Sequence, residues 1–127
     1  ELHDIELSFE GLDSAGGILG HGGFVAFGDE FDPHREVVEW MRFFRDESCG
    51  KCTPCRIGTQ RALELLTRLG TENEKEGDRV LITDLDDIMT STSLCALGGL
   101  AMNPVRSTIE RWPSKFGGHL TPKGGVK

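Results

Sequence analysis

The chain has 127 residues, a length that suits one domain with at most a fragment of a second. Its 21 acidic and 14 basic residues give a net charge of −7. This argues against a nucleic-acid-binding protein, because such proteins usually carry a basic excess. Hydrophobic residues make up 37% of the chain, which is enough for a folded core, and no apolar run approaches the roughly 18 residues that a membrane-spanning helix needs.

The first 32 residues have the pattern of short strands joined by glycines. Residues 5–9 alternate between apolar and polar, which predicts a strand, and the apolar run 24–27 predicts a second, buried strand. A glycine-rich connector over 11–23 separates them. Two short strands alone are marginally stable in water. We therefore interpret residues 1–32 as the terminal strands and glycine-rich connector of a preceding domain, and the chain, which starts at Glu1 and not at Met, as a piece of a longer protein.

Helices are predicted from residue 33 onward. Asp32–Pro33 and Thr53–Pro54 each combine a capping residue with a proline suited to the first helical turn. The helices expected from apolar spacing span residues 33–45, 53–69, 83–91 and 104–112. The charged stretch 71–79 is predicted to be a solvated loop. We expect a mainly α fold, with an antiparallel four-helix bundle over 33–113, preceded by the short β and glycine-rich segment and followed by a flexible tail over 114–127.

Four cysteines are the candidate functional residues. Cys49, Cys52 and Cys55 lie within seven residues, and Cys95 follows forty residues later. In an antiparallel bundle the turn that holds the first three and the loop that holds Cys95 lie at the same end, so the four thiols can converge. Gly50 allows the backbone to turn between the first two cysteines. Cys55 falls in the first turn of the predicted second helix, where free N–H groups and the helix dipole favour a negatively charged centre.

A C-x2-C-x2-C run followed by one distant cysteine is typical of a [4Fe–4S] cluster. Other readings remain open at this point. A zinc-stabilised helical interaction module without a redox role would also use four thiolates, although its usual spacing is two separate C-x2-C pairs. Disulfides would leave a strained short loop. A thioredoxin-like C-x-x-C needs a βαβ context that the pattern lacks.

The stretch ESCGKCTPCRIGT, residues 47–59, resembles the iron–sulfur signature of the NADH-oxidising flavoprotein subunits. This family includes the NADH-binding flavoprotein subunit of respiratory complex I, the diaphorase subunit of NAD-reducing hydrogenases and the beta subunit of NAD-dependent formate dehydrogenases. SLCAL over 93–97 and NPV over 103–105 resemble the family's fourth-ligand loop and the helix that follows it. GILGHGGFV over 17–25 resembles the segment that precedes the cluster domain. The resemblance covers nearly the whole chain in order.

The resemblance implies an electron relay. In this family NADH reduces FMN, and a [4Fe–4S] cluster passes electrons singly between the flavin and further iron–sulfur centres. The ligands of the cluster implied by the matching motifs are Cys49, Cys52, Cys55 and Cys95.

The same resemblance places Leu97 and Gly98 where they could border the flavin site. FMN and NAD(H) themselves would bind in the upstream domain. The chain alone is therefore not expected to catalyse a reaction, and its parent would be an NAD(H)-dependent oxidoreductase. The implied partners are other iron–sulfur subunits, in the cytoplasm or at the inner face of a membrane through those subunits, with no direct membrane insertion and no nucleic acid.

Overall fold

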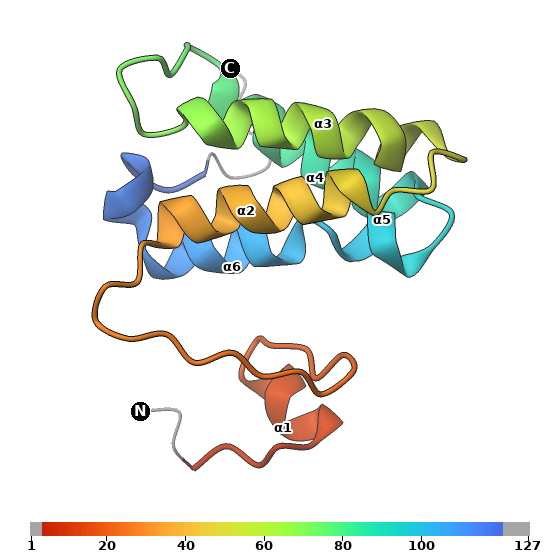
Figure 1. Ribbon diagram of the computed structural model, residues 1–127, viewed down its shortest axis with the longest axis vertical. Helices are drawn as coiled ribbons and strands as arrows, with labels where there is room; N and C mark the ends of the chain where they lie inside the picture. The colour runs from red at the N-terminus through yellow and green to blue at the C-terminus, as the bar shows by residue number, and fades with distance from the viewer. Residues whose placement is uncertain (1–3, 121–127) are drawn as a thin grey trace. The chain divides into compact units, whose positions relative to one another are not determined.

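The computed structural model describes residues 4–120 (Figure 1). The chain divides into two compact units, Glu1–Phe31 and Asp32–Lys127. Every regular element among the described residues is helical, and none of these residues lies in a β-strand. The prediction of a mainly α fold is confirmed, whereas the two predicted strands are wrong.

The described part of the first unit, residues 4–31, contains one short helix, α1 (Phe9–Ser14). Ser8 caps it, since its side-chain oxygen accepts a hydrogen bond from the backbone N–H of Gly11 at 3.1 Å. Residues 24–27 have no regular structure. The apolar patterns over 5–9 and 24–27 therefore do not produce a sheet. A strand is stabilised only when a neighbouring strand pairs with its backbone N–H and C=O groups.

The second unit, over its described residues 32–120, contains four longer helices, a short helix and a 3-10 helix. They are α2 (Pro33–Asp46), α3 (Thr53–Arg68), α4 (Asp78–Thr92), α5 (Ala96–Leu100), α6 (Asn103–Arg111) and η1 (Pro113–Phe116). Figure 1 shows α2 and α3 side by side and running in opposite directions. α4 packs on α3, α6 packs on α2, and α5 packs against both α3 and α4.

The starts of α2 and α3 follow the local sequence. Asp32 caps α2, with its Oδ1 accepting from the backbone N–H of His34 at 3.1 Å. Pro33 occupies the first helical turn, where its missing N–H costs nothing. α3 begins at Thr53, directly before Pro54, as expected. These two signals place the cysteine-rich turn between the end of α2 and the start of α3.

Apolar residues on the facing sides of the helices form one core. Each of them is almost completely removed from solvent, and such burial contributes about 1.5–3 kcal/mol for a large side chain. The largest are Val37, Met41, Leu66, Leu69, Ile82, Met89, Met102, Val105, Ile109 and Phe116. The core therefore joins α2, α3, α4 and α6 with η1, and it supports the loops at both ends of these helices.

The start of α4 differs from the prediction. The helix begins at Asp78, five residues before the expected start at Thr83, and Asp78 is only 2% exposed. Its two carboxylate oxygens accept hydrogen bonds from Nε and Nη2 of Arg68, each at 2.7 Å, and Oδ2 also accepts from the backbone N–H of Lys75 at 2.9 Å. The bond from Arg68 is the main cause that lowers the pKa of Asp78 from 3.8 to about 2. This ion pair fixes the start of α4 against the end of α3.

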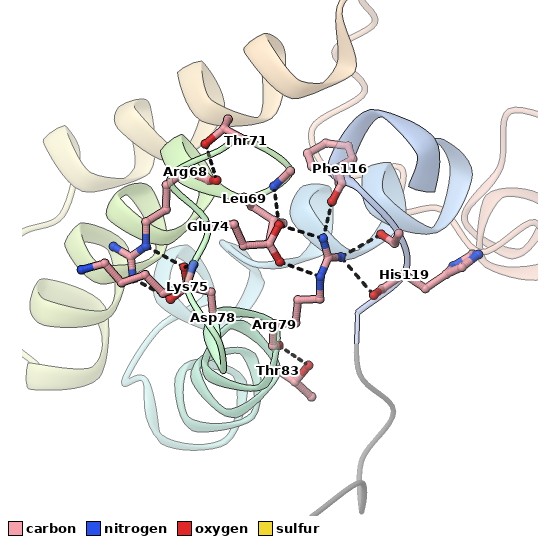
Figure 2. Close-up of polar contacts among 12 residues, drawn as sticks. Arg68, Leu69, Thr71, Glu74, Lys75, Asp78, Arg79, Thr83, Phe116 and His119 are labelled. Atoms are coloured by element: carbon pink, nitrogen blue, oxygen red, sulfur yellow. Dashed lines mark hydrogen bonds and ion pairs between the residues drawn. The ribbon is translucent and has the colours of Figure 1, made fainter.

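Arg79, the next residue, ties the C-terminal segment to α4 (Figure 2). Its guanidinium donates to the carbonyl oxygens of Phe116 at 2.6 Å and Gly118 at 3.0 Å. It also pairs with the carboxylate of Glu74 at 2.8 Å. The stretch 71–79, expected to be only a solvated loop, therefore supplies two residues that hold the second unit together. The hydrophobic pattern could not reveal them, because both act through charge.

The predicted flexible tail over 114–127 is packed in its described part. Pro113–Phe116 forms η1, the side chain of Phe116 is fully buried, and Leu120 packs against the core. Residues 121–127 lie outside the described residues. The high content of glycine and proline in this segment predicted flexibility, although Phe116 anchors the segment in the core.

Replacing Asp78 with Asn is expected to lower the free energy of unfolding by about 2 kcal/mol. This is below the usual 3–5 kcal/mol for breaking a buried pair, because the side chain of Arg68 is 27% exposed. The exposed pair Arg61–Glu64 on α3 is the matched control, and Glu64→Gln should change stability little. Because a lowered pKa gives stability that is present above 3.8 and lost only as the pH falls toward 2, the Asp78→Asn effect should be constant between about pH 5 and pH 8. Equal effects of the two substitutions in urea unfolding would contradict this account.

Candidate metal centre

The turn between α2 and α3 holds three of the four cysteines. Cys49 is exposed, Cys52 is half-buried, and Cys55 is buried in the first turn of α3. Gly50 has a φ of +74°, which confirms the predicted backbone turn between the first two cysteines. Nη1 of Arg56 donates to the carbonyl oxygen of Gly50 at 3.0 Å, so the turn is attached to α3.

The segment after α4 meets this turn. The backbone at Leu94, next to Cys95, lies close enough to the thiol of Cys52 to lower the pKa of that thiol. Gly98 in α5 lies so close to α3 that an added Cβ would be 2.9 Å from the Cβ of Cys55 and 2.5 Å from the Oγ of Ser93. The two cysteine-bearing segments therefore come together at one end of the helices, as the order of the helices predicts.

The four thiols do not surround one point among the described residues. All four are free, and Cys95 is exposed at the cap of α5. Within residues 4–120 no group of three or more His, Cys, Asp or Glu side chains stands in a metal-holding arrangement. The backbone brings the two segments together, and the side chains of Cys49 and Cys95 are exposed.

The backbone around Cys52 favours a thiolate. Hydrogen bonds from the backbone at Leu94 and at Cys55 are the main causes that lower the pKa of the Cys52 thiol, and the positive charge of Arg56 acts in the same direction. Only a thiolate binds a metal tightly, so this shift suits a ligand. The sequence analysis did not identify Leu94, because this residue acts through its backbone and not through its side chain.

Two serines beside Cys55 also escaped the sequence analysis. The Oγ of Ser48 lies 3.2 Å from the Sγ of Cys55. The Oγ of Ser93 is buried and has no hydrogen-bond partner among the described residues. A buried hydroxyl without a partner costs about 1–3 kcal/mol, so its presence indicates that a further acceptor belongs at this end of the unit. No spacing rule points to either serine.

The donor set and its surroundings fit an iron–sulfur cluster. Four free thiols, backbone N–H groups at the start of α3, and one unsatisfied hydroxyl all suit a centre made of sulfur acceptors with a net negative charge.

The family comparison matches residues 35–119, which include all four cysteines, to the NADH-ubiquinone oxidoreductase-F iron-sulfur binding region. The chain belongs to this family. Membership confirms the resemblance of the cysteine motif and gives the chain an iron–sulfur electron-transfer role with a [4Fe–4S] cluster. The alternative of a zinc-stabilised module without a redox role is not favoured.

Relatives of the chain bear names of the same kind. The F subunit of the NADH-quinone oxidoreductase of Streptomyces coelicolor is 34% identical over 95% of the chain, and the F subunit of the same enzyme of Mycobacterium bovis is 36% identical over 95%. The HndC subunit of the NADP-reducing hydrogenase of Solidesulfovibrio fructosivorans is 36% identical over 94%. The chain spans 27%, 27% and 24% of the length of these three relatives, so it corresponds to about a quarter of each.

Gly98 has little room for a side chain, because the atoms nearest to an added Cβ include the Cβ atoms of Cys55 and Ser93. Gly98→Ala would force a methyl group against the Cβ atoms of Cys55 and Ser93, and overpacking of this kind costs about 1–3 kcal/mol. We expect the variant to lose most of its iron after anaerobic reconstitution. Gly99→Ala is the matched control, since its Cβ would meet only the carbonyl oxygen of Thr90 at 3.8 Å. Full iron content in the Gly98 variant would show that the two segments need not touch.

Proposed function

We propose that Cys49, Cys52, Cys55 and Cys95 together bind one [4Fe–4S] cluster. In this proposal α2, α3, α4 and α6 act as an antiparallel four-helix bundle that holds the cluster at one end. The observation that carries it is the close approach of Gly98 to Cys55, because this contact brings the segment of the isolated fourth cysteine to the turn that holds the other three.

The residues of the chain would stabilise the charge of such a centre. When bound, the cluster supplies one-electron transfer. The start of α3, the backbone at Leu94, and the side chains of Lys51 and Arg56 all place positive potential near the sulfur atoms. This potential favours thiolate ligands, and it also favours the extra electron of the reduced state.

The electrons would come from, or go to, other parts of a larger parent protein. We infer an NAD(H)-dependent oxidoreductase as the parent, with FMN and NAD(H) bound outside this chain, and with Leu97 and Gly98 at the border of the flavin site. The inferred partners are other iron–sulfur subunits, and the chain alone has no catalytic activity. The names of the relatives, each a subunit of an oxidoreductase or a hydrogenase, support this inference.

The proposed place of this electron relay is the cytoplasm, or the inner face of a membrane reached through partner subunits. Among the residues that the structure describes, no helix is both long and apolar enough to cross a bilayer.

The first unit supports the proposal that the preceding domain continues beyond this chain. Leu7, Phe9, Phe24 and Val25 are between 67% and 84% exposed. So many large apolar side chains in one short segment usually mark a surface that another part of the protein covers. We propose that residues 1–32 pack onto the preceding part of the parent protein and connect it to the cluster-binding unit.

Anaerobic reconstitution tests the ligand set. The chain is expected to hold about four irons, with broad visible absorption that bleaches on addition of dithionite. Cys95→Ser should lose most of this iron, because Cys95 is the only one of the four cysteines that lies outside residues 49–55. Ser91→Ala, in the last turns of α4, is the control, since its exposed hydroxyl contacts only the carbonyl oxygen of Asp87.

Two results would contradict the proposal. A colourless chain that holds one zinc would remove the electron-transfer role from this unit. A Cys95→Ser variant that keeps all of its iron and its absorption would remove Cys95 from the ligand set and leave the fourth ligand elsewhere.

A further inference from the structure

Ser48 stands at the junction of α2 with the cysteine-rich turn, beside the most buried of the four thiols. Its Oγ lies 3.2 Å from the Sγ of Cys55. The backbone N–H of Gly50 donates to the same Oγ at 3.4 Å. Because the serine oxygen accepts from Gly50, its own proton remains available for the sulfur.

The direction of this hydrogen bond follows from the state of Cys55. As a cluster ligand Cys55 is a thiolate, which can only accept a hydrogen bond. The hydroxyl of Ser48 must therefore donate, and a bond to a charged acceptor is stronger than one to a neutral acceptor. A bound cluster would gain negative charge on reduction, and this charge would strengthen the hydrogen bond that Ser48 donates.

We propose that Ser48 sets the midpoint potential of the cluster by donating a hydrogen bond to the Sγ of Cys55. Hydrogen bonds to the sulfur atoms are one of the means by which proteins tune such potentials. This inference rests on the proposed function, because it requires Cys55 to be a ligand. Ser48 is a positioning residue and not a ligand.

Burial explains why this bond, among those near the cysteines, should matter. Cys55 is only 4% exposed, so water does not replace a donor that is lost there. Cys49 and Cys95 are exposed, and water can donate to them whatever the neighbouring side chains are. The protein therefore controls the hydrogen bonding of Cys55 more closely than that of either exposed cysteine.

The test is a redox titration of the reconstituted chain, followed by electron paramagnetic resonance. Ser48→Ala should lower the midpoint potential with unchanged iron content. At a fixed potential the ratio of reduced to oxidised cluster should fall by about three- to tenfold, and tenfold corresponds to about 59 mV for one electron. Ser48→Thr, which keeps the hydroxyl, should titrate like the unmodified chain. Ser48→Val, which matches threonine in shape but has no hydroxyl, should titrate like Ser48→Ala.

The possible results separate this inference from the proposed function. An unmodified chain without reducible iron would contradict the proposed function itself. A normal cluster in the unmodified chain, with equal potentials for the threonine and valine variants, would overturn only the role of Ser48. Loss of iron from both hydroxyl-free variants would also overturn it, since that result would make Ser48 necessary for retaining the cluster and not for its potential.

Discussion

The contact between Gly98 and Cys55 is the constraint on which the rest of the site depends. The backbone of Gly98, which carries no side chain, passes close to the Cβ of Cys55, and a methyl group would not fit between them. This contact places α5, and with it the cap at Cys95, against the first turn of α3. Without it the chain would offer three neighbouring thiols and a distant fourth. With it, one centre can join two segments that are forty residues apart in the sequence.

The helices keep this contact in place from the opposite end. The pair of Arg68 and Asp78 fixes α4 against α3, and Arg79 fastens the C-terminal segment to the same helix start. Because α3 and α4 run in opposite directions, fixing one end of the pair also determines where the other ends meet. The buried apolar side chains supply most of the stability, whereas these charged groups fix the relative positions of the helices. The ion pair at one end of α3 and α4 and the geometry of the cysteine-bearing segments at the other end are therefore linked through these two helices.

Much of the site could be predicted because its signals are local. The spacing of the cysteines, the turn at Gly50 and the proline at the start of α3 can all be read from a few neighbouring residues. The helix order then placed Cys95 at the correct end. The strands expected over 5–9 and 24–27 failed because an alternating pattern does not state whether a neighbouring strand is present.

The remaining features depend on contacts between distant residues. Asp78 belongs to a charged segment whose composition predicts exposure to solvent. Only the position of Arg68 makes the burial of Asp78 favourable. Gly98 lies in a predicted loop, yet its importance comes from Cys55, which is 43 positions earlier. Ser48 and Ser93 have no spacing signal, since their roles follow from where the folded backbone places two hydroxyls. In our proposal such residues tune the centre, whereas local sequence patterns predict mainly its ligands.

The central claim is that one cluster joins the two cysteine-bearing segments. Hydrogen–deuterium exchange under argon, before and after loading of the cluster, tests it most directly. The account predicts that the backbone amides of residues 48–55 and 93–98 gain protection together, while those of the loop over 71–77, at the other end of α3, change little. Protection confined to residues 48–55, with unchanged exchange over 93–98, would contradict the claim.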